Sequence, residues 1–120
     1  MKYFKGTVNE LAEELEKLID WKNGKFPFCN YALCPLEEEK SPLELCLIAN
    51  HWYGIHKIDS GFDNYDDIEV VSNYWGGGCG QYAELNEDYD VVADIAALIE
   101  ATLDSDGYYD DNCLLIADMY

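Results

Sequence analysis

A chain of 120 residues is long enough to bury the core of one domain and too short for two. Its content of 49% hydrophobic and 14% aromatic residues excludes a disordered acidic tail. The formal net charge of −18 excludes direct binding to nucleic acid and to anionic membranes, because like charges repel.

The first predicted elements are a short strand and an amphipathic helix. Residues 2–6, KYFKG, have the composition of a short strand. The sequence TVNE at Thr7–Glu10 is a capping box, in which each side chain can bond to the other residue's backbone N–H. Helical spacing then continues to about Trp21, with apolar side chains at Val8, Leu11, Leu15, Leu18 and Ile19.

The middle of the chain gives weaker signals. Residues 23–42 contain Gly24 and three prolines and are predicted to be irregular. The sequence SPLE, with Pro42 at the first helical position, indicates a helix that runs to about Asn50 and is followed by an extended segment to Ile58. Residues 59–67 are typical of an acidic loop, residues 68–75 of a strand and residues 76–80 of a glycine-rich turn.

A second clear helix is predicted from about Glu87 to Leu103. At 100° per residue its large apolar side chains share one arc, at Val92, Ile95, Ala96, Ile99 and Leu103. Its carboxylates lie on the opposite side with only alanines between them, at Glu87, Asp90, Asp94, Glu100 and Asp104. Residues 105–111 are predicted to form a turn, and the sequence NCLLIADMY indicates a last strand. We therefore predict that residues 1–120 are one acidic α+β domain, with two main amphipathic helices packed on a small, mostly antiparallel sheet.

Five cysteines and two histidines raise the question of a metal site. Cys29, Cys34 and Cys46, with His51, His56 or Cys79 as a fourth ligand, are a possible tetrahedral zinc set. Structural zinc sites commonly combine two closely spaced pairs of ligands, and the sequence lacks a paired motif for the second half of such a site. We therefore interpret these thiols as small apolar side chains and expect no cofactor. The acidic sequence DSDGYYDD at residues 104–111 lacks the glycine position and the final glutamate of an EF-hand loop.

No sequence around the candidate nucleophiles indicates an enzyme. Cys79 with either histidine has no supporting motif, and the glycines at 76–78 lack the Lys-Ser/Thr that follows a phosphate-binding loop. The chain shows no signal peptide and no apolar stretch of membrane-spanning length, and an odd number of cysteines favours reduced thiols. These features predict a cytoplasmic protein of a bacterial host, with no catalytic role.

The position of the negative charge predicts a basic protein partner. Residues 1–57 carry all seven lysines and nine acids, whereas residues 58–120 carry sixteen acids and no base. Such a field attracts a cationic surface, and tyrosines among the acids can stack on guanidinium groups. The predicted contact residues are Asp63, Asp66, Asp67, Glu87, Asp90, Asp94, Glu100, Asp104, Asp106, Tyr108, Tyr109, Asp110 and Asp111.

The leading hypothesis is thus a nucleic-acid mimic that occludes the basic surface of a nuclease or effector complex. Anti-CRISPR and anti-restriction proteins of phages or mobile elements are inhibitors of this physical type. An immunity or antitoxin protein that covers a basic toxin nuclease would need nearly the same acidic surface. This function is the alternative. A zinc-binding domain centred on Cys29, Cys34 and Cys46 is the alternative from another class.

Overall fold

The computed structural model describes residues 2–22, 26–57, 67–72, 81–84, 90–106 and 113–119. At residues 56, 57, 67–72, 81–84, 105 and 106 it describes the backbone alone. Its elements in chain order are β1 (Lys2–Gly6), α1 (Val8–Leu18), β2 (Cys29–Pro35), α2 (Pro42–Ile48), β3 (Tyr53–Lys57), β4 (Asp67–Ser72), β5 (Gln81–Glu84), α3 (Val91–Asp106) and β6 (Cys113–Met119). The predicted α+β class is confirmed, with the two longer helices on an antiparallel sheet.

The strands form one sheet in the order β1-β6-β2-β3-β4-β5, and all five pairings are antiparallel. The last strand in the sequence, β6, lies between β1 and β2. Its residue Met119 is opposite both Lys2 and Cys29. The β3, β4 and β5 strands follow one another as a meander on the other side of β2.

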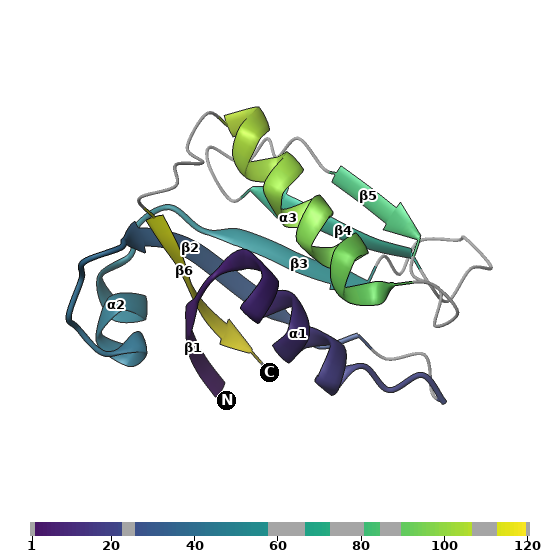
Figure 1. Cartoon of the computed structure of the whole chain (residues 1–120), viewed down its shortest axis with the longest axis horizontal. Coiled ribbons are helices and arrows are strands. Elements are labelled where there is room, and N and C mark those ends of the chain that lie inside the picture. The colour runs from purple at the N-terminus through teal and green to yellow at the C-terminus, as the bar shows by residue number, and fades with distance from the viewer. Residues whose placement is uncertain are drawn as a thin grey trace.

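The sheet carries helices on both faces. Helices α1 and α3 lie side by side over one face and enclose the main core with Tyr31, Tyr53 and Ile55 (Figure 1). Helix α2 packs through Leu45 against Ala32 and other residues in a second, smaller core. Because neighbouring residues of a strand point to opposite faces, Tyr31 and Ala32 place these two cores on opposite sides of the sheet.

Helix α1 forms where its capping box and apolar spacing predict it. The Thr7 hydroxyl accepts a hydrogen bond from the Glu10 backbone N–H at 3.2 Å, and the Glu10 carboxylate accepts one from the Thr7 N–H at 3.1 Å. Val8, Leu11, Ala12 and Leu15 are buried. The helix ends at Leu18, so the predicted end at Trp21 is three residues too far, because Ile19 already has an extended backbone.

Helix α3 begins four residues later and ends three residues later than predicted. Asp90 is its N-cap, since its carboxylate accepts a hydrogen bond from the Ala93 backbone N–H at 3.1 Å. Ile95, Ala96, Ile99 and Leu103 are buried as expected, and Val92 is half-buried. The buried side is wider than the predicted arc, because a helix between a sheet and α1 has two surfaces to cover. It also includes Val91, Leu98 and Thr102.

Helix α2 has Ser41 as its N-cap, as the sequence predicts. The Ser41 hydroxyl accepts from the Glu44 backbone N–H at 3.3 Å and donates to the Glu44 carboxylate at 3.2 Å. The helix ends at Ile48, two residues before the predicted end. The indole N–H of Trp52 donates to the Ala49 carbonyl at 3.3 Å and so satisfies an acceptor at that end.

Two predictions for the sheet were wrong, and one strand was not predicted. Residues 23–42 were expected to be irregular, yet Cys29–Pro35 is β2, a strand between β3 and β6. Strand β5 was not predicted at all. Asp67 was placed in a loop and instead begins β4. The expected strands at residues 2–6 and within 113–119 are confirmed, β3 falls inside the predicted extended segment, and β4 overlaps the predicted strand from residue 68 to residue 72.

Candidate functional site

The outer side of α3 is a continuous acidic surface. Asp90, Glu100 and Asp104 are exposed, and Asp94 is half-buried. The residues between them on this side are alanines, which are also exposed and too short to cover a neighbouring carboxylate. We call this surface the acidic helix face; it consists of Asp90, Ala93, Asp94, Ala97, Glu100, Ala101 and Asp104. From Asp90 to Asp104 it extends about 21 Å along the helix axis.

The chain does not neutralise this face in its described residues. Among residues 2–22, 26–55, 90–104 and 113–119, Lys2 and Lys17 pair with Glu14 and Lys40 pairs with Glu38 at 3.2 Å, and none of these ion pairs includes an acid of this face. Lys5 donates to the backbone carbonyl of Glu38. Helix α3 has no basic residue in its last turn, where a cation would offset the helix dipole. Asp90, Asp94, Glu100 and Asp104 are therefore held close together with no lysine paired to them in the described residues.

Helix α1 adds further carboxylates to the same layer. It lies beside α3, and its Glu13 and Glu16 are exposed. Its Glu14 is drawn toward β1 by Lys2, which lowers the pKa of that carboxyl chiefly through their hydrogen bond. The count of charges by sequence half assigned the negative field to residues 58–120, whereas the fold brings acids from both halves to one side of the sheet.

The structure describes only some of the remaining predicted contact residues. Asp67 begins β4 and Asp106 ends α3, and only the backbone of these two residues is described. Asp63, Asp66, Glu87, Tyr108, Tyr109, Asp110 and Asp111 lie outside the described residues. The acidic helix face therefore contains four of the predicted residues, on one element, as the helical spacing requires.

The three candidate zinc ligands do not come together. Cys29 belongs to the core beneath α1 and α3, whereas Cys34 belongs to the core beneath α2 with Cys46 beside it. Cys29 and Cys34 are five residues apart on one strand, so they point to opposite faces. Within the ranges for which side chains are described, no group of three or more His, Cys, Asp or Glu residues is arranged to hold a metal ion.

Burial keeps these thiols protonated. It raises the pKa of Cys29 and Cys34, and with the negative charge of Asp118 and the Cys34 thiol it raises the pKa of Cys46 to about 11. The thiolate is the nucleophilic form of cysteine, so these three side chains are poor nucleophiles at neutral pH. They act as small apolar residues in the two cores.

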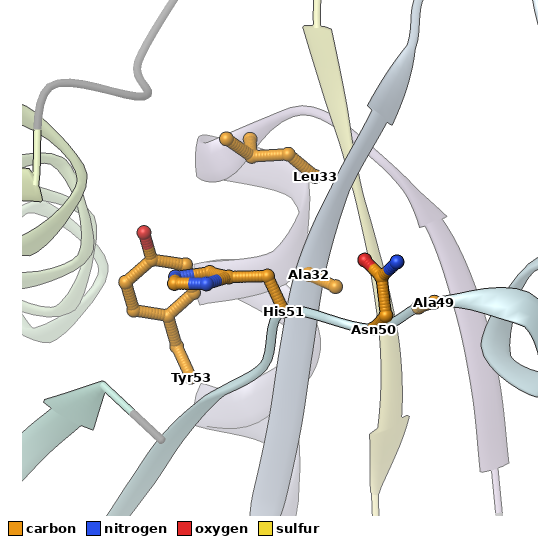
Figure 2. Close-up of a pocket in the computed structure, with 6 residues that line it drawn as sticks. All are labelled: Ala32, Leu33, Ala49, Asn50, His51 and Tyr53. Atoms are coloured by element: carbon orange, nitrogen blue, oxygen red, sulfur yellow. The ribbon is translucent and has the colours of Figure 1, made fainter. Parts of the chain in front are cut away.

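One cavity of about 210 Å³ lies where α2 connects to β3. Figure 2 shows His51 and Tyr53 extending together to one side of this segment, while Asn50 points away from them. The Tyr53 ring stacks on Tyr31 at 5.1 Å between centroids and meets the His51 ring edge-on at 5.0 Å. A second cavity, of about 170 Å³, lies near the start of α1. Both are smaller than the roughly 300–1,000 Å³ of pockets for drug-sized ligands.

Sequence reasoning did not foresee one surface. Helix α2 exposes three large apolar side chains, Leu43, Leu47 and Ile48, of which Leu43 and Leu47 lie on the side away from the buried Leu45. The signal was present, because the sequence PLELCLI has a single polar residue, Glu44. A seven-residue helix that is apolar on all sides cannot bury every side chain against one sheet face.

None of the helices in the described ranges is long and apolar enough to cross a membrane. Comparison of the chain with family models, with curated proteins and with solved structures found no match. Its function must therefore be argued from its own surface chemistry.

Proposed function

We propose that this chain is a non-enzymatic binding protein that occludes the basic, nucleic-acid-binding surface of a partner protein. The acidic helix face presents carboxylates where the partner would otherwise hold phosphates. The partner is a nuclease or an effector complex, and the setting is anti-defence, as in anti-CRISPR or anti-restriction inhibition within a bacterial cytoplasm. The site uses no cofactor.

One observation carries the proposal: the exposed acids of α3 have only alanines between them and no lysine beside them in the described structure. Self-repulsion of this kind reduces the stability of the compact state. The same chain pairs Glu14 of α1 and Glu38 with lysines, so local neutralisation occurs elsewhere in the fold. A cationic partner relieves the repulsion on α3 when it binds.

The arrangement suits arginine and lysine side chains. Guanidinium groups bind carboxylates through two parallel hydrogen bonds, and small alanines between the acids let a flat surface approach closely. Asp94 and Glu100 are about 9 Å apart along the axis, and Asp90 and Asp104 lie about 6 Å beyond them on either side. Long-range attraction gives fast encounter, so the association rate should fall with ionic strength.

The test is competition with DNA. The tagged chain is used to capture proteins from a host lysate, and each captured protein is assayed for binding to labelled duplex DNA with and without added chain. We expect the chain to displace DNA competitively. Capture of a defence nuclease supports the anti-defence setting, whereas capture of a small toxin nuclease assigns the protein to immunity. Captured proteins whose DNA binding is unaffected would contradict the proposal.

A matched pair of variants locates the effect. Glu100→Gln with Asp104→Asn removes two charges from the acidic helix face, and Glu37→Gln with Glu39→Gln removes two equally exposed charges elsewhere. The first variant should bind an arginine-rich protein at least about tenfold more weakly, and the control should bind within about twofold of the wild type. Equal losses in both would show that net charge alone determines binding.

A further inference from the structure

Strand β2 has a free edge beyond the end of its pairing with β3. It pairs with β6 along its whole length, from Cys29 to Pro35, but with β3 only as far as Tyr31. Among the described residues, no main-chain hydrogen bond reaches Ala32–Cys34 from outside the sheet. Alternate residues of a strand direct their N–H and C=O groups to the same side, so part of this stretch directs them away from β6. We call residues 32–34 on this side the β2 free edge.

The cavity of about 210 Å³ lies directly beside the β2 free edge. Its lining consists of Ala32, Leu33, Ala49, Asn50, His51 and Tyr53. Tyr53 is opposite Tyr31 in the last pair of β2 and β3, so the cavity begins where that pairing ends. Figure 2 shows Leu33, His51 and Tyr53 extending to the same side of β2. A cavity of roughly 150 Å³ holds a benzene molecule, so this one has room for a side chain of the size of leucine.

A main-chain edge beside a cavity is the arrangement that binds an extended peptide. Main-chain hydrogen bonds hold the added strand, and the cavity selects one of its side chains. A helix does not fit such an edge, because its own N–H and C=O groups already bond to one another. The net charge of −18 repels anionic ligands and favours a peptide with basic residues.

We propose that the β2 free edge binds an extended, basic segment of a partner protein. The segment lies beside β2 beyond Tyr31 and continues the sheet on the side where β3 ends. It places one leucine-sized apolar side chain in the cavity, with basic residues on both sides of that side chain in its sequence. None of the residues that carry this inference belongs to the acidic helix face, so it and the proposed function can fail separately.

Binding of a labelled synthetic peptide to the full chain tests the site. The probe is the heptapeptide KTVLVTK, and fluorescence anisotropy should give a dissociation constant on the order of 100 µM. The same peptide with glycine in place of leucine has the same charge but no side chain for the cavity. It should bind at least about tenfold more weakly. The absence of binding by KTVLVTK at 1 mM, or equal binding by the glycine peptide, would overturn the proposal.

Two further peptides test the main-chain pairing. One is N-methylated at both valines and the other at the leucine and both threonines, so that each lacks the N–H groups of alternate residues. In a paired strand only one of these two sets points to β2. One peptide should therefore lose binding by at least about tenfold, and the other should bind within about threefold of the parent. Equal affinities would show that charge alone attracts the peptides and would contradict the proposal.

Substitutions in the protein locate the site. Ala49→Leu adds bulk to the cavity lining and should weaken binding of KTVLVTK at least about fivefold. The control is Leu36→Phe, which adds bulk beside the second cavity and should bind within about twofold of the wild type. Circular dichroism checks that both variants fold, and the peptide comparisons use the wild type and do not depend on them. Equal affinities in the two folded variants would place the peptide elsewhere.

Hydrogen exchange separates this site from the acidic helix face. Saturating KTVLVTK should slow the exchange of at least one amide in Ala32–Cys34, because its N–H becomes bonded to the peptide. Glu100→Gln with Asp104→Asn should leave the affinity ratio of the leucine and glycine peptides unchanged. Unchanged exchange at the β2 free edge, or a ratio that falls to one in this variant, would overturn the proposal.

Discussion

Helices α1 and α3 lie side by side on one sheet face and solve the same packing problem, but they treat charge in opposite ways. Each buries an apolar side against the shared core, and each begins with a side-chain cap. Helix α1 then pairs Glu14 with two lysines and places Lys17 in its last turn. Helix α3 has no such neutralisation. The difference shows that one fold can pair an acid of one helix with lysines while the acids of the neighbouring helix have no lysine beside them in the described residues.

The buried sides of the two helices should be equally important to stability. Leu15 of α1 and Leu103 of α3 are both fully buried, so Leu15→Ala and Leu103→Ala should each lower the free energy of unfolding by about 2–5 kcal/mol. Urea denaturation measures this loss. Leu18→Ala, at an exposed position of α1, is the control and should cost less than about 1 kcal/mol. A small loss at Leu103 alone would mean that α3 is held less firmly than α1.

The caps should also contribute alike. Thr7→Ala removes the acceptor at the start of α1, and Asp90→Ala removes the acceptor at the start of α3. Each should cost about 1 kcal/mol in urea denaturation, whereas Asp90→Asn should cost almost nothing, because asparagine caps as well as aspartate. If Asp90→Ala were stabilising, repulsion on the acidic helix face would outweigh the cap.

Neutralising carboxylates should have opposite effects on stability in the two helices. Changing Asp90, Asp94 and Asp104 to Asn together with Glu100→Gln should raise the free energy of unfolding by up to about 1 kcal/mol by relieving repulsion. Changing Glu14 to Gln should lower it slightly, because that carboxylate is paired. Added salt should reduce both differences. Loss of stability in the α3 variant would show that its acids have favourable partners.

The smallest effect should be the pH dependence of the Glu14 pairing. The pKa of Glu14 is lowered in the folded chain, chiefly by its hydrogen bond to Lys2. The stabilisation is therefore present above the ordinary value of 4.5 and is lost as the pH falls through the folded pKa. Thermal unfolding of wild type and Glu14→Gln should differ at pH 7 and converge as the pH falls below the folded pKa. A difference that stayed constant as the pH fell would come from packing rather than charge.

The parts of the fold that sequence predicted are those with strong local signals. The capping box at Thr7 and the 3.6-residue spacing of both long helices depend only on neighbouring residues. Strand β2 was missed because a strand covered on both faces has no polar alternation: Tyr31 and Ala32 are both buried, on opposite sides. Strand β5 is only four residues long, too short for a periodic pattern to stand out.

The candidate site was predictable to the extent that it lies on one helix. Asp94, Glu100 and Asp104 share the outer side of α3 because of helical geometry alone. That α1 places Glu13 and Glu16 in the same layer depends on the packing of distant segments, which a single sequence does not show. The exposure of Leu43 and Leu47 likewise depends on which side of α2 meets the sheet.

The place of β6 in the sheet has a consequence for how quickly the protein reaches its native state. Strand β1 joins the sheet only through β6, and its pairing of Lys2 with Met119 links residues 117 positions apart. Closing so long a loop is entropically slow, and contacts of such separation are associated with low folding rates. Nearly the whole chain must therefore be available before β1 can dock, so assembly of this edge should be a late event in folding.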